Sequence, residues 1–371
     1  MIRIRAGVPR RTGRLRTTSR PLRRILTFGL PAIWGATAVS FKLTCPLAHQ
    51  AGLGARIATS AVFLAVGTGI VLHIRRALLR ELRQARRIAG AAQSVLLRPP
   101  PPRVAWLNTA AAQLSADREA AVGGDLYEVV ATEHGVRAVM GDVRGHGLGA
   151  LATVAAVLGS FREAVHDETD LDGVLRRLER ALARHLRERA RAEHPSAGSP
   201  LLLDPVAEEF VTLLLVEIGT DGEVRALNCG HPWPYLLSGT RVEQLARADP
   251  LPPLGPFPLP ADLPAVPLGR LLPGDALVLY TDGVEDARNA DGRFFPLPAV
   301  LAALVRDEPL SPQAVLHGVF TALLHHTRGT PADDIALLVL ADGRRTPSGE
   351  RGTARPAGHP RSALHLQPLG D

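Results

Sequence analysis

The sequence predicts an α+β sandwich domain preceded by a two-helix transmembrane hairpin. The domain is predicted because, after residue 105, strand-like runs come in blocks and helical stretches come in pairs. The hairpin is predicted because two uncharged apolar runs, 25–41 and 57–74, lie between arginine clusters. We therefore expect a basic cytoplasmic arm, two spans, a helix with a proline-rich linker, the domain and a disordered tail, at 1–24, 25–74, 75–104, 105–341 and 342–371.

The charge of the chain is divided unevenly along its length. The 371 residues have a formal net charge of +7, but residues 1–87 carry +16 and residues 88–371 carry −9. A DNA-binding domain needs a basic face, so the acidic balance of the domain excludes a nucleic-acid partner. The 46% content of hydrophobic residues excludes disorder of the whole chain. Cys45 and Cys229 are the two cysteines, too few for a disulfide framework or a cysteine zinc site.

The two apolar runs have the length and the flanks of membrane spans. As helices, their 17 and 18 residues would cover about 26 to 27 Å of a hydrocarbon core roughly 30 Å thick. Nine arginines precede the first run and six follow the second, whereas Lys42 and Arg56 lie between them. The positive-inside rule then predicts a multi-pass protein of the cell membrane with its domain in the cytoplasm. The alternative, a signal peptide followed by a buried helix, lacks an evident small-residue cleavage site.

Residues 75–95 have apolar residues at helical spacing and arginine at the other positions. One interpretation is a juxtamembrane helix that rests on anionic membrane lipids. The other is a coiled-coil stalk that pairs two subunits into a homodimer, and the sequence leaves both open. Prolines 99–102 end the helix and predict a domain boundary near residue 105.

The domain is predicted element by element from its periodicity. A β-hairpin is expected at 125–131 and 136–143, joined through Glu133, His134 and Gly135. Helical periodicity follows at 148–164 and 171–190, and again at 297–305 and 312–325. Further strands are expected at 210–218, 224–228, 235–238, 276–281 and 335–340.

Acidic residues stand beside the ends of these strands. They are Asp125, Asp142, Asp282 and the pair Asp333 and Asp334. One Asp next to Gly is typical of an ordinary turn, but four such points in one domain indicate a shared site. Gathered carboxylates repel one another unless a cation neutralises them. Oxygen ligands without cysteine favour Mg²⁺ or Mn²⁺ over zinc.

Five motifs extend this interpretation, in the order GGDLYE, GDVRGHG, NCGHP, TDGVEDAR and DDIALLV. Over residues 105–341 they resemble the PPM-type metal-dependent serine/threonine phosphatases, in the bacterial sporulation-stage-II and sigma-factor-regulator branch. The resemblance implies a sandwich of two antiparallel sheets flanked by helix pairs, with two Mn²⁺ or Mg²⁺ ions. It implies hydrolysis of phosphoserine or phosphothreonine by a metal-bridging water. The expected substrate is a phosphorylated protein, an antagonist of an anti-sigma factor.

The resemblance also implies roles for individual residues. Asp125 corresponds to the acid that bridges both metals. Asp142 corresponds to the acid in the facing strand, and the backbone carbonyl of Val143 is the neighbouring ligand. Asp282 and Asp333 correspond to the acids that hold the second metal, and Asp334 fills a place where the family allows Asp or Asn.

The chain departs from the family at two outer positions. Glu128 stands where the branch most often has Asp, and Ala336 replaces the usual Thr or Ser. These departures support an alternative, a catalytically inactive, membrane-tethered docking module that binds a phosphorylated regulator. A diguanylate cyclase, which GGDLYE also resembles, gives no reason for Asp282 or Asp333.

Two histidines receive no catalytic role. His146 lies four residues after Asp142, whereas the proposed general-acid histidine of the eukaryotic relatives lies two after. Asn228 and His231 match a branch motif, which we interpret as a structural strand–turn element. No arginine occupies an obvious substrate-phosphate position, which leaves recognition of the phosphate to the metals.

A regulatory hypothesis follows from the order of the elements. The helices at 148–190 directly follow Asp142, so a shift in their packing would move that acid and gate metal binding. We hypothesise that the helix at 75–95 transmits a membrane or dimer signal to them.

Overall fold

The computed structural model describes residues 30–44, 52–114, 123–145, 147–193, 209–307, 311–329 and 331–344. The chain divides into two compact units, Met1–Ile88 and Ala89–Asp371, and each is described by itself. The predicted basic arm at 1–24, most of the predicted tail and His146 lie outside the described residues.

In the first unit, helix α2 (Leu30–Thr44) packs against the N-terminal part of helix α4 (Leu53–Leu96). The indole Nε1–H of Trp34 donates a hydrogen bond to the carbonyl of Phe63 at 3.1 Å. The ring of Phe63 lies 5.4 Å from that of Trp34 and 5.5 Å from that of Phe41. A Cβ atom at Gly67 would lie only 3.2 Å from Trp34, so this glycine allows the close approach. The two apolar stretches therefore form a packed pair of helices.

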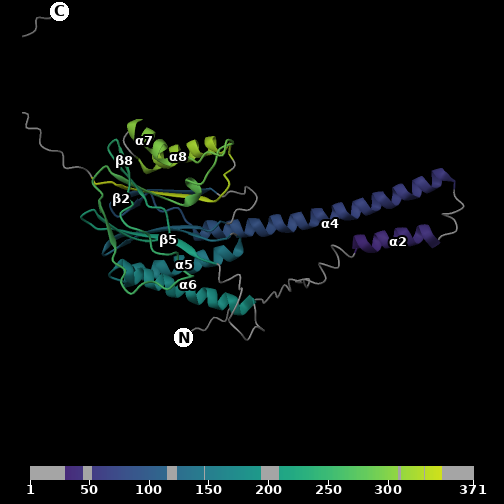
Figure 1. Ribbon diagram of the computed structural model, residues 1–371, viewed down its shortest axis with the longest axis horizontal. Coiled ribbons are helices and arrows are strands. Elements are labelled where there is room, and N and C mark those ends of the chain that lie inside the picture. Colours follow the sequence, from purple (N-terminus) through teal and green to yellow (C-terminus); the bar gives the residue numbers. More distant parts are fainter. Residues whose placement is uncertain are drawn as a thin grey trace, which may run out of the picture. The chain divides into compact units, whose positions relative to one another are not determined.

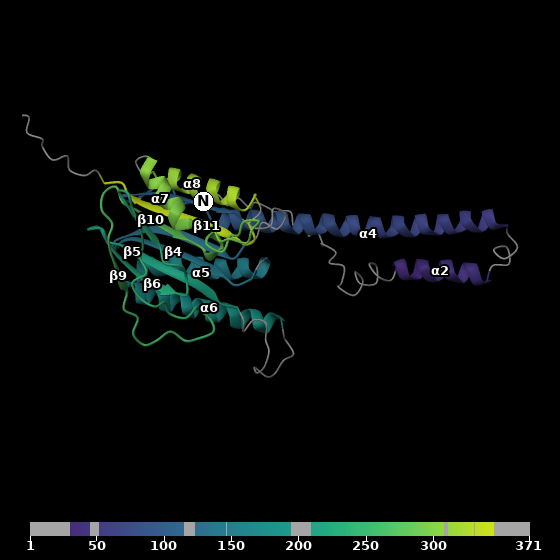
Figure 2. The same cartoon turned by 45° about the horizontal axis from the view of Figure 1, so that its top comes forward.

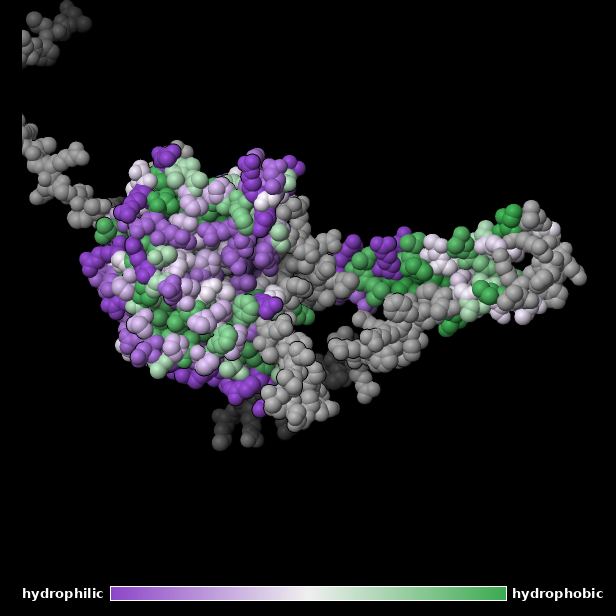
Figure 3. Space-filling view, viewed as in Figure 1, coloured by the Kyte–Doolittle hydropathy of each residue, from purple (hydrophilic) through white to green (hydrophobic). Residues whose placement is uncertain are grey.

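Helix α4 contains a candidate membrane span. Its segment Ile57–Glu81 has 25 residues with a mean hydropathy of 2.0, and its 18-residue apolar window is not buried. Figure 3 shows apolar side chains, in green, on the surface of this part of α4. The described residues include one further helix that is long and apolar enough, Leu148–Asp167, but half of its window is buried inside the domain.

Helix α4 continues where the sequence predicts two separate helices, at 57–74 and 75–95. Its 44 residues form one helix, which at 1.5 Å per residue is about 66 Å long. Between Gly69 and Gly90 there is no proline or glycine to interrupt it, so nothing in the chain stops the helix where the arginines begin.

The second unit is a sandwich of two antiparallel sheets between two helix pairs (Figures 1 and 2). The six-stranded sheet has the order β1 (Arg103–Val104), β2 (Leu107–Leu114), β11 (Ile335–Asp342), β10 (Ala276–Tyr280), β7 (Tyr235–Ser238) and β8 (Arg241–Gln244). The five-stranded sheet has the order β3 (Asp125–Thr132), β4 (Gly135–Val143), β5 (Val211–Ile218), β6 (Glu223–Cys229) and β9 (Val266–Arg270). Helices α5 (Leu148–Asp167) and α6 (Leu171–Glu193) cover the five-stranded sheet, and α7 (Leu297–Asp307) and α8 (Pro312–His326) cover the other. The predicted fold class is confirmed.

Both faces of the central strands are buried, which explains their continuous apolar runs. In β11, Leu338 and Leu340 enter the core between the two sheets, whereas Leu337 and Val339 face α7 and α8. The core between the five-stranded sheet and its helices is a separate layer, centred on residues such as Phe161 of α5. The sandwich thus has three apolar layers, and polar groups can gather only where the strands end.

The sequence does not predict four of the strands: β1, β2, β8 and β9. The most important of them is β2, which pairs with β11 along its whole length, from Leu107 opposite Asp342 to Leu114 opposite Ile335. Its sequence, LNTAAAQL, has alanines in place of the β-branched residues that favour strands. Tertiary pairing with β11 overrides that weak local preference. At the other end of the pair, β11 continues one residue beyond the predicted domain end at 341.

A buried arginine ties helix α5 to strand β4. The side chain of Arg137 has no exposed surface, and its Nε–H donates to a carboxylate oxygen of Glu217 at 2.7 Å. Its terminal nitrogens donate to the backbone carbonyls of Val165, Glu168 and Thr169. Carbonyls at the end of a helix have no partner within the helix. Arg137 therefore supplies donors where α5 ends and fixes that end on the sheet.

We predict that Arg137→Met destabilises the domain by about 3 to 5 kcal/mol, because it leaves a carboxylate and three carbonyls without their donor. Urea unfolding of a fragment that begins at Ala89 would measure this. The matched control is Arg225→Met, whose ion pair with Glu223 is half exposed and should change the free energy of unfolding by less than about 1 kcal/mol. Equal, small effects of both substitutions would show that Arg137 does not anchor α5.

Candidate active site

Two of the predicted acids face each other across the first hairpin. Asp125 opens β3 and is directly opposite Asp142, near the end of β4, in the antiparallel register. Alternate residues of a strand share a face, so Asp125 lies on the same face as Tyr127 and Val129, which enter the core between the sheets. Asp125 is 3% exposed. The hairpin therefore brings both carboxylates to one end of the sandwich, between its sheets.

The two glycines before Asp125 allow the backbone to approach other acids closely. A Cβ atom at Gly124 would lie 2.2 Å from the carbonyl oxygen of Val143 and 2.7 Å from a carboxylate oxygen of Asp142. A Cβ atom at Gly123 would lie 2.3 Å from a carboxylate oxygen of Asp334. The clash at Gly124 is with backbone, so the motif requires glycine there, whereas a side chain at position 123 would displace the carboxylate of Asp334.

The remaining acids come from the six-stranded sheet. Asp282 begins a single 3₁₀ turn, Asp282–Val284, directly after β10. Asp333 and Asp334 come directly before β11, which is the neighbour of β10. A Cβ atom at Gly283 would lie 2.0 Å from the backbone oxygen of Asp334. The turn and the start of β11 are therefore in contact at the same edge.

The electrostatics are those of carboxylates that lie near one another. Burial raises the pKa of Asp125 well above its usual range, and the further causes are the carboxylates Asp142, Asp334, Asp282 and Asp333. Burial also raises the pKa of Asp142 to about 7, with help from Asp282, Asp333 and Asp334. The pKa of Asp282 is raised by burial and then by Asp333. The charged side chains that shift these three pKa values are all acids, and none of them is basic.

The donor set suits a divalent cation. It consists of carboxylate oxygens and a backbone carbonyl, the hard ligands that Mg²⁺ and Mn²⁺ prefer, and their mutual repulsion is what a cation would relieve. Within the described residues, no three His, Cys, Asp or Glu side chains converge on a single ion position. The fit therefore rests on the chemistry and crowding of the donors.

The hydroxyl of Thr281 lies between Ala336 and Asp125. The backbone N–H of Ala336 donates to Thr281 Oγ1 at 2.8 Å, and that hydroxyl donates to a carboxylate oxygen of Asp125 at 3.4 Å. Thr281 is fully buried and is the residue before Asp282. A hydroxyl that can orient the carboxylate of Asp125 is thus present at the end of β10, the strand that pairs with β11.

His231 belongs to a buried turn. The side chain of Asn228 accepts a hydrogen bond from the backbone N–H of His231 and donates one to its carbonyl, both at 2.8 Å. The imidazole Nδ1 lies 3.1 Å from Thr212 Oγ1, and Thr212 is the register partner of Asp142. Burial lowers the pKa of His231 to about 3, so its ring is neutral. These contacts agree with the structural strand–turn interpretation of the NCGHP motif.

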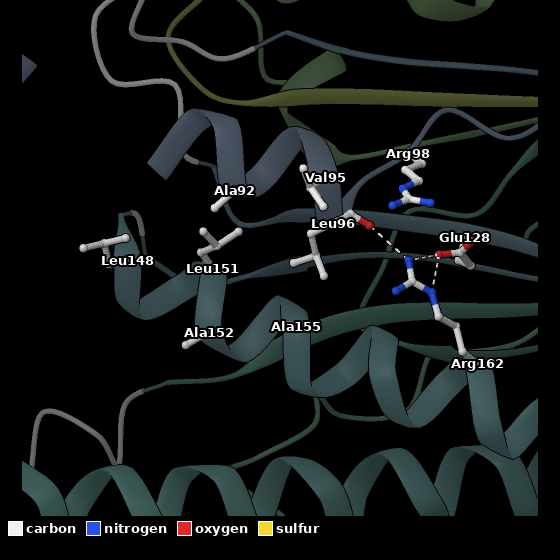
Figure 4. A pocket seen from close by; sticks show the side chains of 10 residues that line it. All are labelled: Ala92, Val95, Leu96, Arg98, Glu128, Leu148, Leu151, Ala152, Ala155 and Arg162. Atoms are coloured by element: carbon white, nitrogen blue, oxygen red, sulfur yellow. Dashed lines mark hydrogen bonds and ion pairs between the residues drawn. The ribbon is translucent and has the colours of Figure 1, made fainter. Parts of the chain in front are cut away.

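Glu128 takes part in an ion pair at the rim of a pocket (Figure 4). The Arg162 guanidinium on α5 lies 2.5 Å from a carboxylate oxygen of Glu128 and donates to the backbone carbonyl of Leu96 at 3.0 Å. In Figure 4 these dashed contacts join the last turn of α4 to α5 and β3. Side chains of Val95 and Leu151 line the same pocket. The longer acid at position 128 is therefore engaged by Arg162.

The end of α4 also reaches the acidic edge. The buried side chain of Gln93 accepts a hydrogen bond from the backbone N–H of Gly123 at 3.2 Å. Gly123 is two residues before Asp125 and lies against the carboxylate of Asp334. A helix that begins in the first unit thus ends, within the second unit, on the loop that carries Asp125.

Gln93, Thr281 and Asp286 are near the site and have no role in the sequence analysis. The carboxylate of Asp286 adds to the raised pKa of Asp282, and its N–H donates to the carbonyl of Asp282 at 2.8 Å. Asp286 and Thr281 stand inside the TDGVEDAR motif, so attention to every polar residue of that motif would find them. The Gln93 contact spans 30 residues, and no local pattern signals it.

Solved structures of similar fold are known. The SiaA-PP2C domain of Pseudomonas aeruginosa matches with a TM-score of 0.53 at 18% identity, over 72% of this chain and 97% of that one. The RsbU and RsbW domains of a Mycobacterium tuberculosis protein match at 23% identity and a TM-score of 0.49, over 65% of this chain. The PP2C domain of SpoIIE from Bacillus subtilis, solved with a fragment of its regulatory domain, matches at 17% identity and a TM-score of 0.48, also over 65% of this chain. This chain spans 61% and 64% of the last two structures, less than two thirds of each.

The fold is that of a PP2C-type (PPM) domain, with the acids at one edge of the sandwich. The family model of stage II sporulation protein E (SpoIIE) matches residues 132–341, which is more than half of the chain. The chain belongs to the SpoIIE family.

The raised pKa of Asp142 predicts how the metal-free domain responds to pH. A folded-state pKa of about 7 against an ordinary value of 3.8 means that the folded state holds the proton more tightly. The resulting stabilisation is complete below the ordinary value and is lost as the pH rises through about 7. In EDTA, the unfolding temperature should therefore fall between pH 5 and pH 8.

Thermal unfolding of wild type and Asp142→Asn, with EDTA or Mn²⁺, would test this. The neutral side chain of the variant should make the fall with pH smaller, and Mn²⁺ should reduce it in wild type. An identical pH dependence in wild type and Asp142→Asn would contradict the assignment.

Proposed function

We propose that the chain is a metal-dependent protein phosphatase that hydrolyses phosphoserine or phosphothreonine with two Mn²⁺ or Mg²⁺ ions. The observation that supports it is the gathering of five carboxylates at one edge of the sandwich, with no basic side chain among the main influences on their pKa values. Asp125 and Asp142 with the carbonyl of Val143 would hold metal from the five-stranded sheet. Asp282, Asp333 and Asp334 would hold it from the other. When bound, such ions polarise phosphoryl oxygens and make water a nucleophile at neutral pH.

The side chains and glycines of the chain itself would then position the metal-binding acids. Thr281 holds Asp125 through its hydroxyl, and the glycines at 123 and 124 let the acids approach. No side-chain nucleophile is needed, and the buried groups nearby are unsuited to that role. Burial raises the pKa of the Cys229 thiol to about 12, and His231 is neutral and buried. The reaction is therefore a direct hydrolysis.

We propose a phosphorylated regulator, an antagonist of an anti-sigma factor, as the protein substrate. Membership of the stage II sporulation family supports this class of substrate. The net charge of −9 over residues 88–371 gives no support to a nucleic-acid partner.

We also propose that the chain is anchored in the cell membrane by two spans, with the phosphatase domain in the cytoplasm. The apolar α2–α4 pair and the candidate span Ile57–Glu81 support anchoring. The arginines on both sides of the apolar runs support the orientation and a contact with membrane lipids. Pairing of two subunits through α4 is the homodimer variant of this proposal. The five predicted regions remain its outline, and the family match at 132–341 lies inside the predicted domain.

The second candidate function is an inactive docking module. Glu128 and Ala336 favour it, since both depart from the family pattern. The hydroxyl of Thr281 beside Asp125 and the retention of all five acids support the active enzyme instead.

We propose that the end of α4 regulates the site. Gln93 holds the backbone of Gly123, and Arg162 connects the carbonyl of Leu96 to Glu128. A displacement of α4 would break or bend these contacts and move the loop before Asp125. Signals from the membrane side of the chain would reach the acids by this route.

Replacement of single acids tests the proposed activity. In a fragment that begins at Ala89, Asp125→Asn and Asp282→Asn should each lower Mn²⁺-dependent release of phosphate from a phosphoserine peptide by at least about 100-fold. The matched control is Asp221→Asn, which alters an exposed acid in the β5–β6 turn, at the opposite end of those strands. Activity that survives both site substitutions would overturn the proposal, and binding without turnover in saturating Mn²⁺ would support the docking module.

A second experiment tests the regulatory contact. Gln93→Ala should raise the Mn²⁺ concentration needed for half-maximal activity by roughly 10-fold, the lower range for loss of a group that orients metal ligands. Ser94→Ala is the control, because its exposed hydroxyl bonds only to the carbonyl of Ala91 within the helix. An unchanged Mn²⁺ requirement in Gln93→Ala, and in a fragment that begins at Leu97, would remove α4 from the regulation.

A further inference from the structure

We infer that Arg144 binds the phosphoryl group of the substrate at the rim of the acidic edge. The inference rests on the proposed function and adds to it a residue that the sequence analysis did not assign. The ligand would be the dianionic phosphate of a phosphoserine or phosphothreonine side chain.

The backbone places Arg144 beside the acids. Its N–H donates to the carbonyl of Phe210 at 2.9 Å, which continues the β4–β5 pairing one step beyond Val143 and Val211. Arg144 is two residues after Asp142, in the bend that directly follows β4, so their Cα atoms are at most about 7 Å apart. An arginine side chain is long enough to cover that distance. Arg144 therefore lies next to the proposed ligands, at the exposed side of the acidic edge.

Its side chain is held by an aromatic ring. The guanidinium carbon lies 5.3 Å from the centre of the Phe210 ring, within the range of a cation–π contact. Arg144 is exposed, as are Asp282 and Asp333, whereas Asp125 is buried, so the cation lies on the solvent-accessible side of the acidic edge. Phe210 directly precedes β5 and is fixed to the sheet through its backbone carbonyl. The contact limits the positions that the guanidinium takes without burying it.

Charge and shape both favour a phosphate ligand. Five carboxylates and two divalent ions would leave a net charge of about −1 at the edge, so a dianionic substrate would gain from one more cation. A guanidinium presents donors in a planar fork that matches two phosphate oxygens at once. Arg144 could thus bind the phosphate from the solvent side, opposite the ions.

The same chemistry limits what Arg144 does in the reaction. In the hydrolysis, a water oxygen bonds to phosphorus while the bond from phosphorus to the seryl oxygen breaks, and the seryl oxygen takes up the proton that the water gives. A guanidinium stays protonated and is not a general acid. Arg144 would therefore affect binding of the phosphate more than the leaving of the alcohol.

The test uses the full chain in detergent with saturating Mn²⁺, and compares wild type with Arg144→Met and Arg144→Lys. We expect the methionine variant to raise the KM for a phosphoserine peptide and for an aryl phosphate by about 10- to 100-fold, the cost of a lost charged hydrogen bond. The Kd of inorganic phosphate, measured by titration calorimetry, should rise by a similar factor, while kcat falls less than about threefold. Lysine should restore part of the loss, because it keeps the charge without the fork. Mn²⁺ binding, measured in the same way, should be unchanged.

The controls separate the two claims. Arg241→Met changes an exposed arginine at the β7–β8 turn, at the end of β7 away from Asp282, and should leave KM unchanged. Absence of Mn²⁺-dependent turnover in wild type would overturn the proposed function itself. An active wild type, with KM and the phosphate Kd of Arg144→Met within twofold of it, would overturn the role of Arg144 alone. If Arg144→Met does not fold, Arg144→Gln is judged by the same two constants.

Discussion

The repulsion between carboxylates at one edge of the sandwich is the constraint on which the rest of the structure depends. Asp125 is almost fully buried and has acids as its main charged neighbours, so the fold places one carboxylate out of contact with water and beside like charges. A fold tolerates such an arrangement only if its framework is stable without it and a cation relieves it. The three apolar layers supply the framework, and divalent ions are the natural counter-charge.

The framework brings the acids together from segments far apart in the chain. Asp125 and Asp142 are neighbours because a tight hairpin pairs β3 with β4, whereas Asp282 and Asp334 join them because β10 pairs with β11. Each sheet contributes one pair of strand ends, so the site exists only when both sheets are packed. Contacts such as that of Thr281 with Asp125 run between the two sheets and hold the halves of the site in register.

Much of the fold and of the site could be predicted from the sequence. Strand-like runs with both faces apolar, and Asp beside Gly at their ends, are local patterns, and the structure gathers the five acids at one edge. Strand β2 could not be predicted, because alanines carry no strand signal and its pairing with β11 is long-range. The contact of Gln93 with Gly123 and the position of the Thr281 hydroxyl between Ala336 and Asp125 depend on packing between distant segments. A motif can be recognised by the spacing of its residues along the sequence. Residues that meet only in the folded structure have no such characteristic spacing.

The most direct test of the account is the uptake of Mn²⁺ by the metal-free domain, followed by titration calorimetry near pH 6.5 in two buffers of different ionisation enthalpy. Because the pKa of Asp142 is raised to about 7, the acids hold protons that a metal must displace. The account predicts that about two ions bind and that protons are released, so that the apparent enthalpy depends on the buffer. Absence of Mn²⁺ binding, or binding whose enthalpy is the same in both buffers, would contradict it.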